Sequence, residues 1–269
     1  MRQPSRPNAY HDQRFIESRD ARALRILAEY LEPLSRFERH GVKDTIVFMG
    51  SARLLSQEAA QAALTKAEAT GQGVDAARNA LAQSVYYEAA RELAFRLTNW
   101  SKTLDRDERR FVVCTGGGPG IMEAANRGAS EAKGLNVGLT ISIPNDEFDN
   151  PYVSRELHFH FHYFFMRKFW FVYLAKAVVL FPGGFGTLDE MFEILTMVQT
   201  GKMRKRMPIV LFGAKYWDDV VNFDALVRAG TISPEDLALF HRTDSVDEAY
   251  ELITRGLLEN AIGSPGAVL

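Results

Sequence analysis

The sequence predicts an α/β protein: a Rossmann-like, doubly wound parallel sheet in a single domain with an N-terminal helical extension. Two observations support this. Short, uninterrupted apolar segments alternate with helix-forming segments, as expected for strands that are buried on both faces and joined by crossover helices. Several of these segments also run directly into turns, at Gly50, Gly116 and Pro182. Because crossovers are right-handed, parallel strands should place these turns along one sheet edge.

Length and composition fit one large domain. The chain has 269 residues, of which 46% are apolar, enough for a sizeable core. We expect a helical extension over residues 1–40 and a nucleotide-binding domain over residues 41–258. A helical insertion at about 57–84 and a flexible tail over 259–269 complete the expected organisation.

Charge and cysteine content narrow the class of protein. A formal charge of −2 indicates no general attraction to nucleic acid or anionic membranes. The single cysteine, Cys114, excludes an internal disulfide and is expected in the core. No apolar run approaches the ~20 residues of a membrane span, and Met1 to Asp20 lacks the apolar core of a signal peptide. We therefore expect a cytoplasmic protein.

The first part of the chain predicts three helices around one strand. Apolar residues at three- and four-residue spacing indicate a helix over Phe15–Phe37, which should pack outside the main domain or on a second subunit. Thr45–Met49 is the first strand. Two segments rich in Ala, Glu and Leu, 57–70 and 76–100, predict an exposed helical hairpin that leads into the crossover helix.

The remaining elements continue the alternation. Strands are expected at 111–115, 136–143 (closed by Pro144), 157–161, 178–181 and 208–212. Helices are expected at 121–133, 166–176, from Thr187 onward, 216–228 and 246–258, with a loop at 145–156.

The segment Ala177–Glu190 is the most informative part of the chain. A buried strand ends at Pro182, three glycines follow, and a helix begins at Thr187. Free amides at a helix N-terminus and close backbone approach at glycine together predict a phosphate site. Thr187-x-x-Glu190 also fits a capping box, in which Glu190 would only stabilise the helix start.

A helical wheel places Glu190 on the non-core side of this helix. Five residues form the expected buried stripe: Leu188, Met191, Phe192, Leu195 and Val198. Glu190 and Glu193 share the opposite side with Met197, an arrangement that suits a cleft for ribose and base. Glu193 could bind ribose hydroxyls or simply be a surface charge.

Neither glycine turn fits the common nucleotide motifs. The turn Gly116–Gly120 has Ile121 where the dinucleotide fingerprint requires its third glycine, and no Gly-Lys-Ser/Thr ends either turn. NAD and nucleoside triphosphates are therefore not indicated. Two glycine turns on one sheet edge could instead hold the phosphate and sugar of one nucleotide from two sides.

Several segments together resemble the Lonely Guy (LOG) family. They are Pro182–Glu190, which fits PGGxGTxxE, together with Gly50–Arg53, Gly116–Asn126, Arg167-Lys168 and Gln199–Lys202, in family order. Members hydrolyse the N-glycosidic bond of nucleoside 5′-monophosphates, including AMP and cytokinin riboside monophosphates, to free base and ribose 5-phosphate. Older annotation calls them lysine decarboxylases. The chain is similar to the longer bacterial members, but the insertion at 57–84 and Phe165, in place of a family histidine, depart from the pattern.

The resemblance implies the role of each site residue. Arg167 and Glu190 would be catalytic, and no cofactor would be needed. The phosphate would lie on Gly183, Gly184, Gly186 and Thr187. Sugar and base would contact the other turns and helix faces: Gly50, Ser51, Gly117, Gly118, Met122 and Glu193. The family also implies a homodimer or higher homo-oligomer with sites near the interface.

Other interpretations stay open at this point. The fold could serve a non-catalytic nucleotide or cofactor carrier, or a nucleotide-sensing regulator. His158, His160 and His162 share one strand face, but no acidic or cysteine partner nearby has ligand spacing, so we expect no metal. The basic run Lys202–Arg206 is expected to be a solvated loop.

Overall fold

The computed structural model describes residues 8–104, 108–142 and 149–267. Its centre is a seven-stranded parallel sheet with strand order β4-β3-β2-β1-β5-β6-β7, which confirms the predicted α/β class. The strands are β1 (Thr45–Met49), β2 (Val112–Thr115), β3 (Asn136–Ile141), β4 (His158–Phe161), β5 (Ala175–Leu180), β6 (Ile209–Phe212) and β7 (His241–Thr243).

Strand order reverses between β1 and β5. The chain builds β1 to β4 outward in one direction and then returns to the other side of β1 with β5. Crevices for ligands form at such a reversal, outside the carboxyl ends of the strands. Here those ends lead to Gly50 and Pro182, and the Ser51 amide donates to the Pro182 carbonyl at 2.9 Å.

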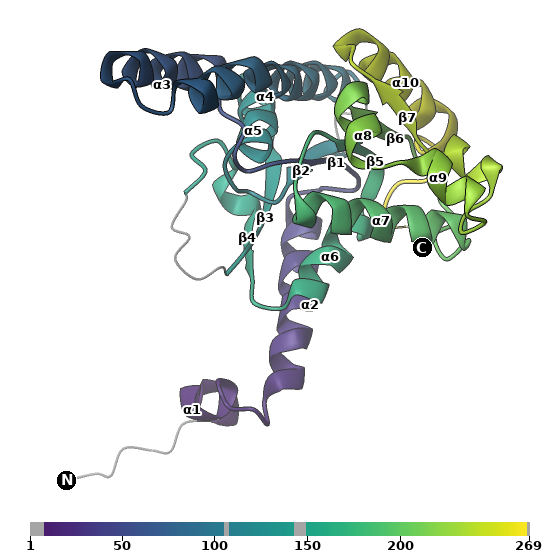
Figure 1. Ribbon diagram of the computed structural model, residues 1–269. Coiled ribbons are helices and arrows are strands. Elements are labelled where there is room, and N and C mark those ends of the chain that lie inside the picture. Colours follow the sequence, from purple (N-terminus) through teal and green to yellow (C-terminus); the bar gives the residue numbers. More distant parts are fainter. Residues whose placement is uncertain (1–7, 105–107, 143–148, 268–269) are drawn as a thin grey trace.

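Helices cover both faces of the sheet (Figure 1). On one face, α4, α5 and α10 pack against Ile46 and Phe48 of β1. On the other face, α2, α6 and α7 pack against Val47 and Met49. This alternation along β1 explains why its residues are apolar without interruption.

The helices have the following bounds: α1 (Gln13–Ile16), α2 (Arg22–Arg39), α3 (Gln57–Thr70), α4 (Val74–Ser101), α5 (Ile121–Glu131), α6 (Phe164–Tyr173), α7 (Phe185–Gln199), α8 (Ala214–Val220), α9 (Phe223–Arg228) and α10 (Val246–Asn260). Short 3-10 helices lie at Ala9–His11, Arg155–Leu157 and Pro234–Leu239. No helix in the described part of the chain has the length and apolar character needed to cross a bilayer.

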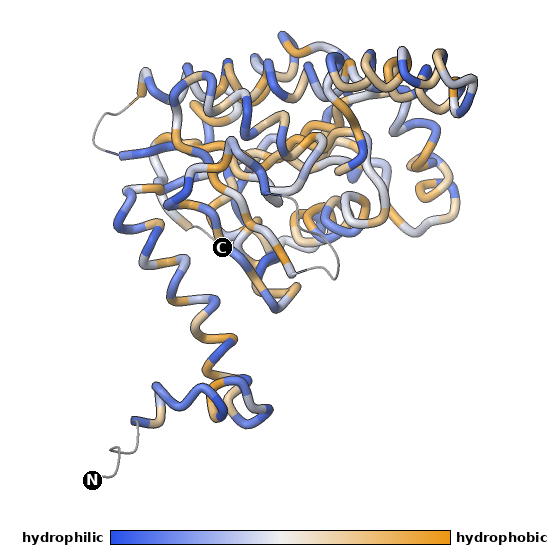
Figure 2. Tube along the Cα trace, turned by 90° about the vertical axis from the view of Figure 1, so that its left-hand side faces the viewer, coloured by the Kyte–Doolittle hydropathy of each residue, from blue (hydrophilic) through white to orange (hydrophobic). Residues whose placement is uncertain are grey.

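The N-terminal helix is broken rather than continuous over Phe15–Phe37. The Arg25 guanidinium donates to the carbonyls of Ile16 and Ser18 and so closes the end of α1 before α2 begins. The C-terminal half of α2 packs on α6, while its N-terminal half projects from the body (Figure 2). Leu24, Leu27 and Leu31 of α2 are each 50% exposed; a second subunit on this face stays a prediction.

Three further features differ from the sequence-based expectation: the end of one helix, the division of another helix, and an additional strand. The helix expected at 166–176 ends at Tyr173, because Ala175 already pairs with β1 and Lys176 lies in β5. The helix expected at 216–228 is two helices, because the Asn222 side chain caps α9. The strand β7 was not predicted, since His241–Thr243 carries no apolar pattern.

The segment expected to be a flexible tail is attached to the domain. α10 extends to Asn260, and the Arg110 side chain donates to the carbonyls of Ala261 and Ile262. The Gly266 amide donates to Asp44 Oδ1 at 3.0 Å. Pro144, the first part of the expected 145–156 loop, residues 1–7 and residues 268–269 lie outside the described residues.

The basic run Lys202–Arg206 is only partly a solvated loop. Arg204 is exposed, but Lys205 is 8% exposed and its ammonium donates to the carbonyls of Val172 and Tyr173. Burial lowers the pKa of Lys205 to about 8. Lys205 is therefore a buried residue that joins this loop to the end of α6.

Candidate active site

The turn between β5 and α7 has the form expected of an anion site. Gly184 is the N-cap of α7, and the first amide to bond within the helix is that of Leu188, to the Gly184 carbonyl at 3.0 Å. The amides of Phe185, Gly186 and Thr187 therefore precede the intrahelical bonds and are free to meet a ligand. A Cβ atom added to Gly184 or Gly186 would meet nothing within 4 Å, so open space lies beside these glycines.

A hydrogen bond and close packing fix the position of Gly183 in this turn. Tyr216 Oη donates to the Gly183 carbonyl at 2.6 Å. A Cβ atom at Gly183 would lie 2.2 Å from Oγ1 of Thr187, which is itself buried. Gly183 is thus required by close packing, whereas Gly184 and Gly186 border the open space.

The capping-box interpretation of Thr187 and Glu190 is wrong. α7 begins at Phe185, so Thr187 lies inside its first turn, and no side chain caps the helix. The expected buried stripe also changes: Phe192 is 40% exposed, and Ile194 is buried instead. Glu190 is therefore not engaged in capping the helix.

Glu190 faces Arg167 across the cleft. Glu190 Oε1 lies 3.7 Å from Arg167 Nη1, and the two side chains are 14% and 11% exposed. Arg167 comes from α6 and Glu190 from α7, so the pair joins two helices that follow different strands. A nearly buried carboxylate thus lies beside a nearly buried guanidinium in this cleft.

Burial sets the protonation of this pair. It raises the pKa of Glu190 to about 7, against the opposing effect of the Arg167 charge. Burial also lowers the pKa of Arg167 from its ordinary value. At neutral pH Glu190 is populated in both protonation states, which suits a group that exchanges a proton during a reaction.

Arg167 is held in place by its surroundings. Its Nε donates to the Leu139 carbonyl at 2.7 Å, and its guanidinium lies 4.9 Å from the ring centroid of Phe171. A Cβ atom at Gly116 would be 2.5 Å from Arg167 Nη2. The GGG turn after β2 therefore contributes room for the arginine, a role that its motif alone did not indicate.

These groups line one cleft of about 870 Å³ at the β1/β5 reversal. Its walls come from the turn after β1, the turn after β5, and the starts of α5, α6 and α7. The cleft brings together nine of the predicted site residues: Gly50, Ser51, Met122, Arg167, Gly183, Gly184, Gly186, Thr187 and Glu190. This volume lies within the range of small-molecule sites.

Three predicted contact residues do not line the described part of this cleft. Gly117 packs toward Thr140 and its amide donates to Thr115 Oγ1, while the Gly118 carbonyl accepts from the Asn150 side chain. Glu193 instead pairs with Lys168 Nζ at 3.0 Å, beside Asp189 at 2.7 Å. Glu190 and Glu193 thus have different surroundings although they are one turn apart.

Sequence reasoning missed several residues that line the cleft, among them Leu54 and Ile141. Phe164 lies at the start of α6, and Tyr216 supports the turn between β5 and α7 from α8. Asn79 and Gln83 come from α4, in the helical insertion. Their spacing of four residues places them on one helix face, but no local signal indicated that this face meets the cleft.

Of the two histidines on β4, His160 is engaged in hydrogen bonds with neighbouring hydroxyl groups. His160 Nδ1 lies 3.0 Å from Thr140 Oγ1, and Nε2 lies 2.8 Å from Ser142 Oγ. Burial lowers the pKa of His158. No group of three His, Cys, Asp or Glu side chains in the described ranges has a metal-binding arrangement. Cys114 is buried, as predicted.

The chain is similar to one described protein family and to several characterised proteins. A family model described as "Possible lysine decarboxylase" matches residues 122–253. The pyrimidine/purine nucleotide 5′-monophosphate nucleosidase of Escherichia coli is 31% identical over 121 residues, covering 40% of this chain and 25% of the relative. The cytokinin riboside 5′-monophosphate phosphoribohydrolase LOG7 of Arabidopsis thaliana is 40% identical over 62 residues, covering 22% of this chain and 28% of the relative.

Among solved structures, a molybdenum cofactor carrier protein from Chlamydomonas reinhardtii matches with 18% identity and a TM-score of 0.47, over 80% of this chain and 99% of the carrier. The chain spans about a quarter of the length of the curated relatives named above. The matched family segment contains both Arg167 and Glu190. The resemblance to the LOG family that the motifs indicate is therefore confirmed by this family match and by the relatives named above, at modest identity.

Proposed function

We propose that the protein hydrolyses the N-glycosidic bond of a nucleoside 5′-monophosphate, AMP or an N6-modified AMP, to free base and ribose 5-phosphate. The observation that carries this proposal is the buried Arg167–Glu190 pair, which lines the same cleft as the start of α7, whose free amides can receive a phosphate. The relatives named as nucleosidase and phosphoribohydrolase support the same reaction class.

The geometry suggests how the reaction would proceed. Phosphate bound at Gly184–Thr187 holds the ribose in register, which lowers the entropic cost of aligning C1′ and water. The bond between C1′ and the base nitrogen breaks, its electron pair leaves with the base, and the ribose acquires cationic character. Ionised Glu190 stabilises that charge or accepts a proton from the attacking water. The water oxygen becomes the new hydroxyl on C1′, and the departing base takes up one proton, which balances the proton that the water gives up.

Arg167 has two functions in this scheme. Its positive charge counters part of the rise in the Glu190 pKa, so that the carboxylate is available near neutral pH. Its remaining guanidinium N–H groups can donate to the departing base, which gains negative charge as the bond breaks. Neither function needs a metal ion or an organic cofactor.

The test of the proposal is product identification in isotopically labelled water. The purified protein incubated with AMP in ¹⁸O-water should release free adenine and ribose 5-phosphate, with ¹⁸O on C1′. Nucleotide that stays bound without base release would contradict the proposal and favour a carrier. Base release that requires added phosphate would show phosphorolysis instead of hydrolysis.

The rate is expected to depend on pH through Glu190. Because its pKa is about 7 and the ionised form is active, kcat/KM for AMP should fall about tenfold per pH unit well below 7 and reach a plateau above it. Inhibition by ribose 5-phosphate, measured over the same pH range, shows how ionisation of the phosphate affects binding. This effect can then be distinguished from the ionisation of Glu190. A profile that is flat from about pH 5 to pH 8 would show that the ionisation of Glu190 does not control the rate.

A further inference from the structure

The N-terminal part of α4 overhangs the cleft. Crossover helices run antiparallel to the strands, so the start of α4 lies at the carboxyl edge of the sheet, where the cleft is. Buried residues of α4 begin at Ser84 and continue to Thr98. The preceding turns, which pack on α3 rather than on the sheet (Figure 1), extend beyond the sheet edge. Asn79 and Gln83 lie on these turns and border the cleft.

Both side chains are available to a ligand. Asn79 is exposed and Gln83 half-buried. In the described part of the chain, neither side chain forms a hydrogen bond with the protein, in contrast to Asn126 and Asn150, whose amides are bonded internally. Each carboxamide can donate and accept at the same time and carries no charge.

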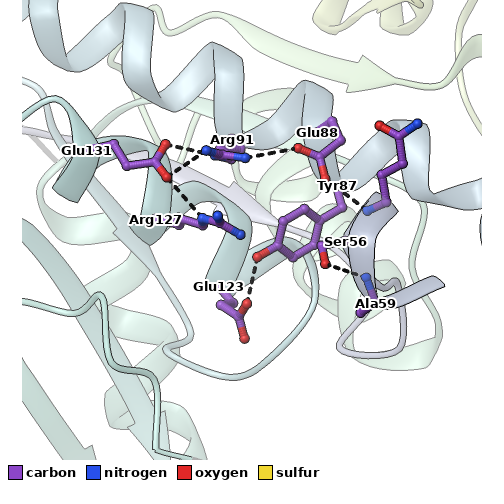
Figure 3. A network of polar contacts seen from close by, with 9 residues as sticks. Ser56, Ala59, Tyr87, Glu88, Arg91, Glu123, Arg127 and Glu131 are labelled. Atoms are coloured by element: carbon purple, nitrogen blue, oxygen red, sulfur yellow. Dashed lines mark hydrogen bonds and ion pairs between the residues drawn. The ribbon is translucent and has the colours of Figure 1, made fainter. Parts of the chain in front are cut away.

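A polar network fixes α4 in this position (Figure 3). Tyr87, one turn after Gln83, donates to Glu123 Oε1 on α5 at 2.6 Å. Arg91 pairs with Glu131 on α5 at 2.7 Å, and Glu88 accepts from the Gln57 amide at the start of α3 at 3.0 Å. The network ties both helices of the insertion to α5, whose first turn supplies Met122 to the cleft. Asn79 and Gln83 therefore project from a braced helix and not from a free loop.

Different parts of the cleft wall carry different chemical groups. The α7 N-terminus supplies backbone amides for a phosphate, and Glu190 with Arg167 supplies charge for the ribose. Met122, Ile141 and Phe164 are apolar and suit the flat face of a base. The α4 face adds neutral carboxamides, which suit a base edge with a donor and an acceptor side by side.

We propose that Asn79 and Gln83 are specificity residues that bind the edge of an adenine-type base, its amino group and the neighbouring ring nitrogen. A carboxamide pairs with the N6 and N7 positions of adenine through one donated and one accepted bond. Hypoxanthine presents two acceptors on that edge, so it can form only one of the two bonds. The assignment rests on the proposed function and gives its substrate class: the insertion selects aminopurine nucleotides.

The experiment measures binding to the full chain by calorimetry with AMP, inosine 5′-monophosphate and ribose 5-phosphate. Wild type should bind AMP more tightly than inosine 5′-monophosphate. In Asn79→Ala and Gln83→Ala, AMP affinity should fall about 2- to 10-fold per variant, the effect of one neutral hydrogen bond. Ribose 5-phosphate affinity should not change. Gln61→Ala is the matched control, since Gln61 is an exposed carboxamide on α3 that borders a different groove.

Three results would overturn this assignment. Equal losses for AMP and ribose 5-phosphate would place the carboxamides on the phosphate or sugar. Unchanged AMP affinity, or equal losses for AMP and inosine 5′-monophosphate, would show that they do not read the base edge. Titration in the Glu190→Gln background, in which base release is slow, keeps AMP intact during the measurement. Absence of adenine release from AMP by the unmodified chain contradicts the hydrolase, while selective loss of AMP binding still supports the base contact.

Discussion

Replacing Glu190 with Gln is expected to lower the rate of adenine release from AMP by about 10²- to 10⁴-fold, the usual contribution of a positioned acid–base group. Gln has nearly the shape of Glu, but it carries no charge for the cationic ribose and accepts no proton. Glu193→Gln is the matched control on the same helix, because Glu193 pairs with Lys168 away from the cleft. It should leave the rate nearly unchanged. Equal rates for wild type and Glu190→Gln would show that this carboxylate does not take part in the chemistry.

The same substitution should stabilise the protein at alkaline pH. Burial raises the pKa of Glu190 from 4.5 to about 7, so the folded state binds this proton more tightly than the unfolded state. This tighter proton binding contributes on the order of 3 kcal/mol to the free energy of unfolding. The contribution is fully present below about pH 4.5 and is lost as the pH rises through about 7. Glu190→Gln should exceed wild type in unfolding free energy at about pH 8 and nearly equal it at about pH 4.5. Urea unfolding at both pH values measures the difference.

Replacing Asp44 with Ala is expected to cost about 3–5 kcal/mol of folding stability, the usual effect of removing one partner of a buried ion pair. Asp44 is fully buried and pairs with Arg110 Nε, with Lys176 Nζ at 3.7 Å. It also accepts from the Gly266 amide. Without this carboxylate, two buried cations lose their counter-charge and the C-terminal segment loses an attachment point.

Urea unfolding at neutral pH measures this loss. Asp219→Ala is the control, because Asp219 pairs with Lys215 on the exposed face of α8, where an ion pair contributes about 0–1 kcal/mol. Asp44 precedes β1 and therefore lies at the opposite sheet edge from the cleft, so folded Asp44→Ala should keep its AMP affinity. A loss below about 1 kcal/mol would contradict the role of Asp44 as the shared counter-charge.

Local patterns were enough to predict most of the fold. Uninterrupted apolar runs such as Ile46–Met49 predicted strands covered on both faces, and the structure places both core clusters against β1. Predictions failed where local signals were weak or were overridden. His241–Thr243 became a strand through pairing with β6 alone, and Lys176 entered β5 although it follows a helical pattern.

The sequence by itself determined the chemistry available at one sheet edge: the glycine turns, the start of a helix, and Glu190 with Arg167. Strand polarity and right-handed crossovers place such segments together in any parallel sheet of this order. Only the tertiary structure decided which side chains enter the cleft. α7 begins two residues earlier than its motif indicated, so Glu190 faces Arg167 while Glu193 turns to Lys168. Burial, which raises the pKa of Glu190, and the overhang of α4, which supplies Asn79 and Gln83, arise from contacts between distant segments and leave no local pattern.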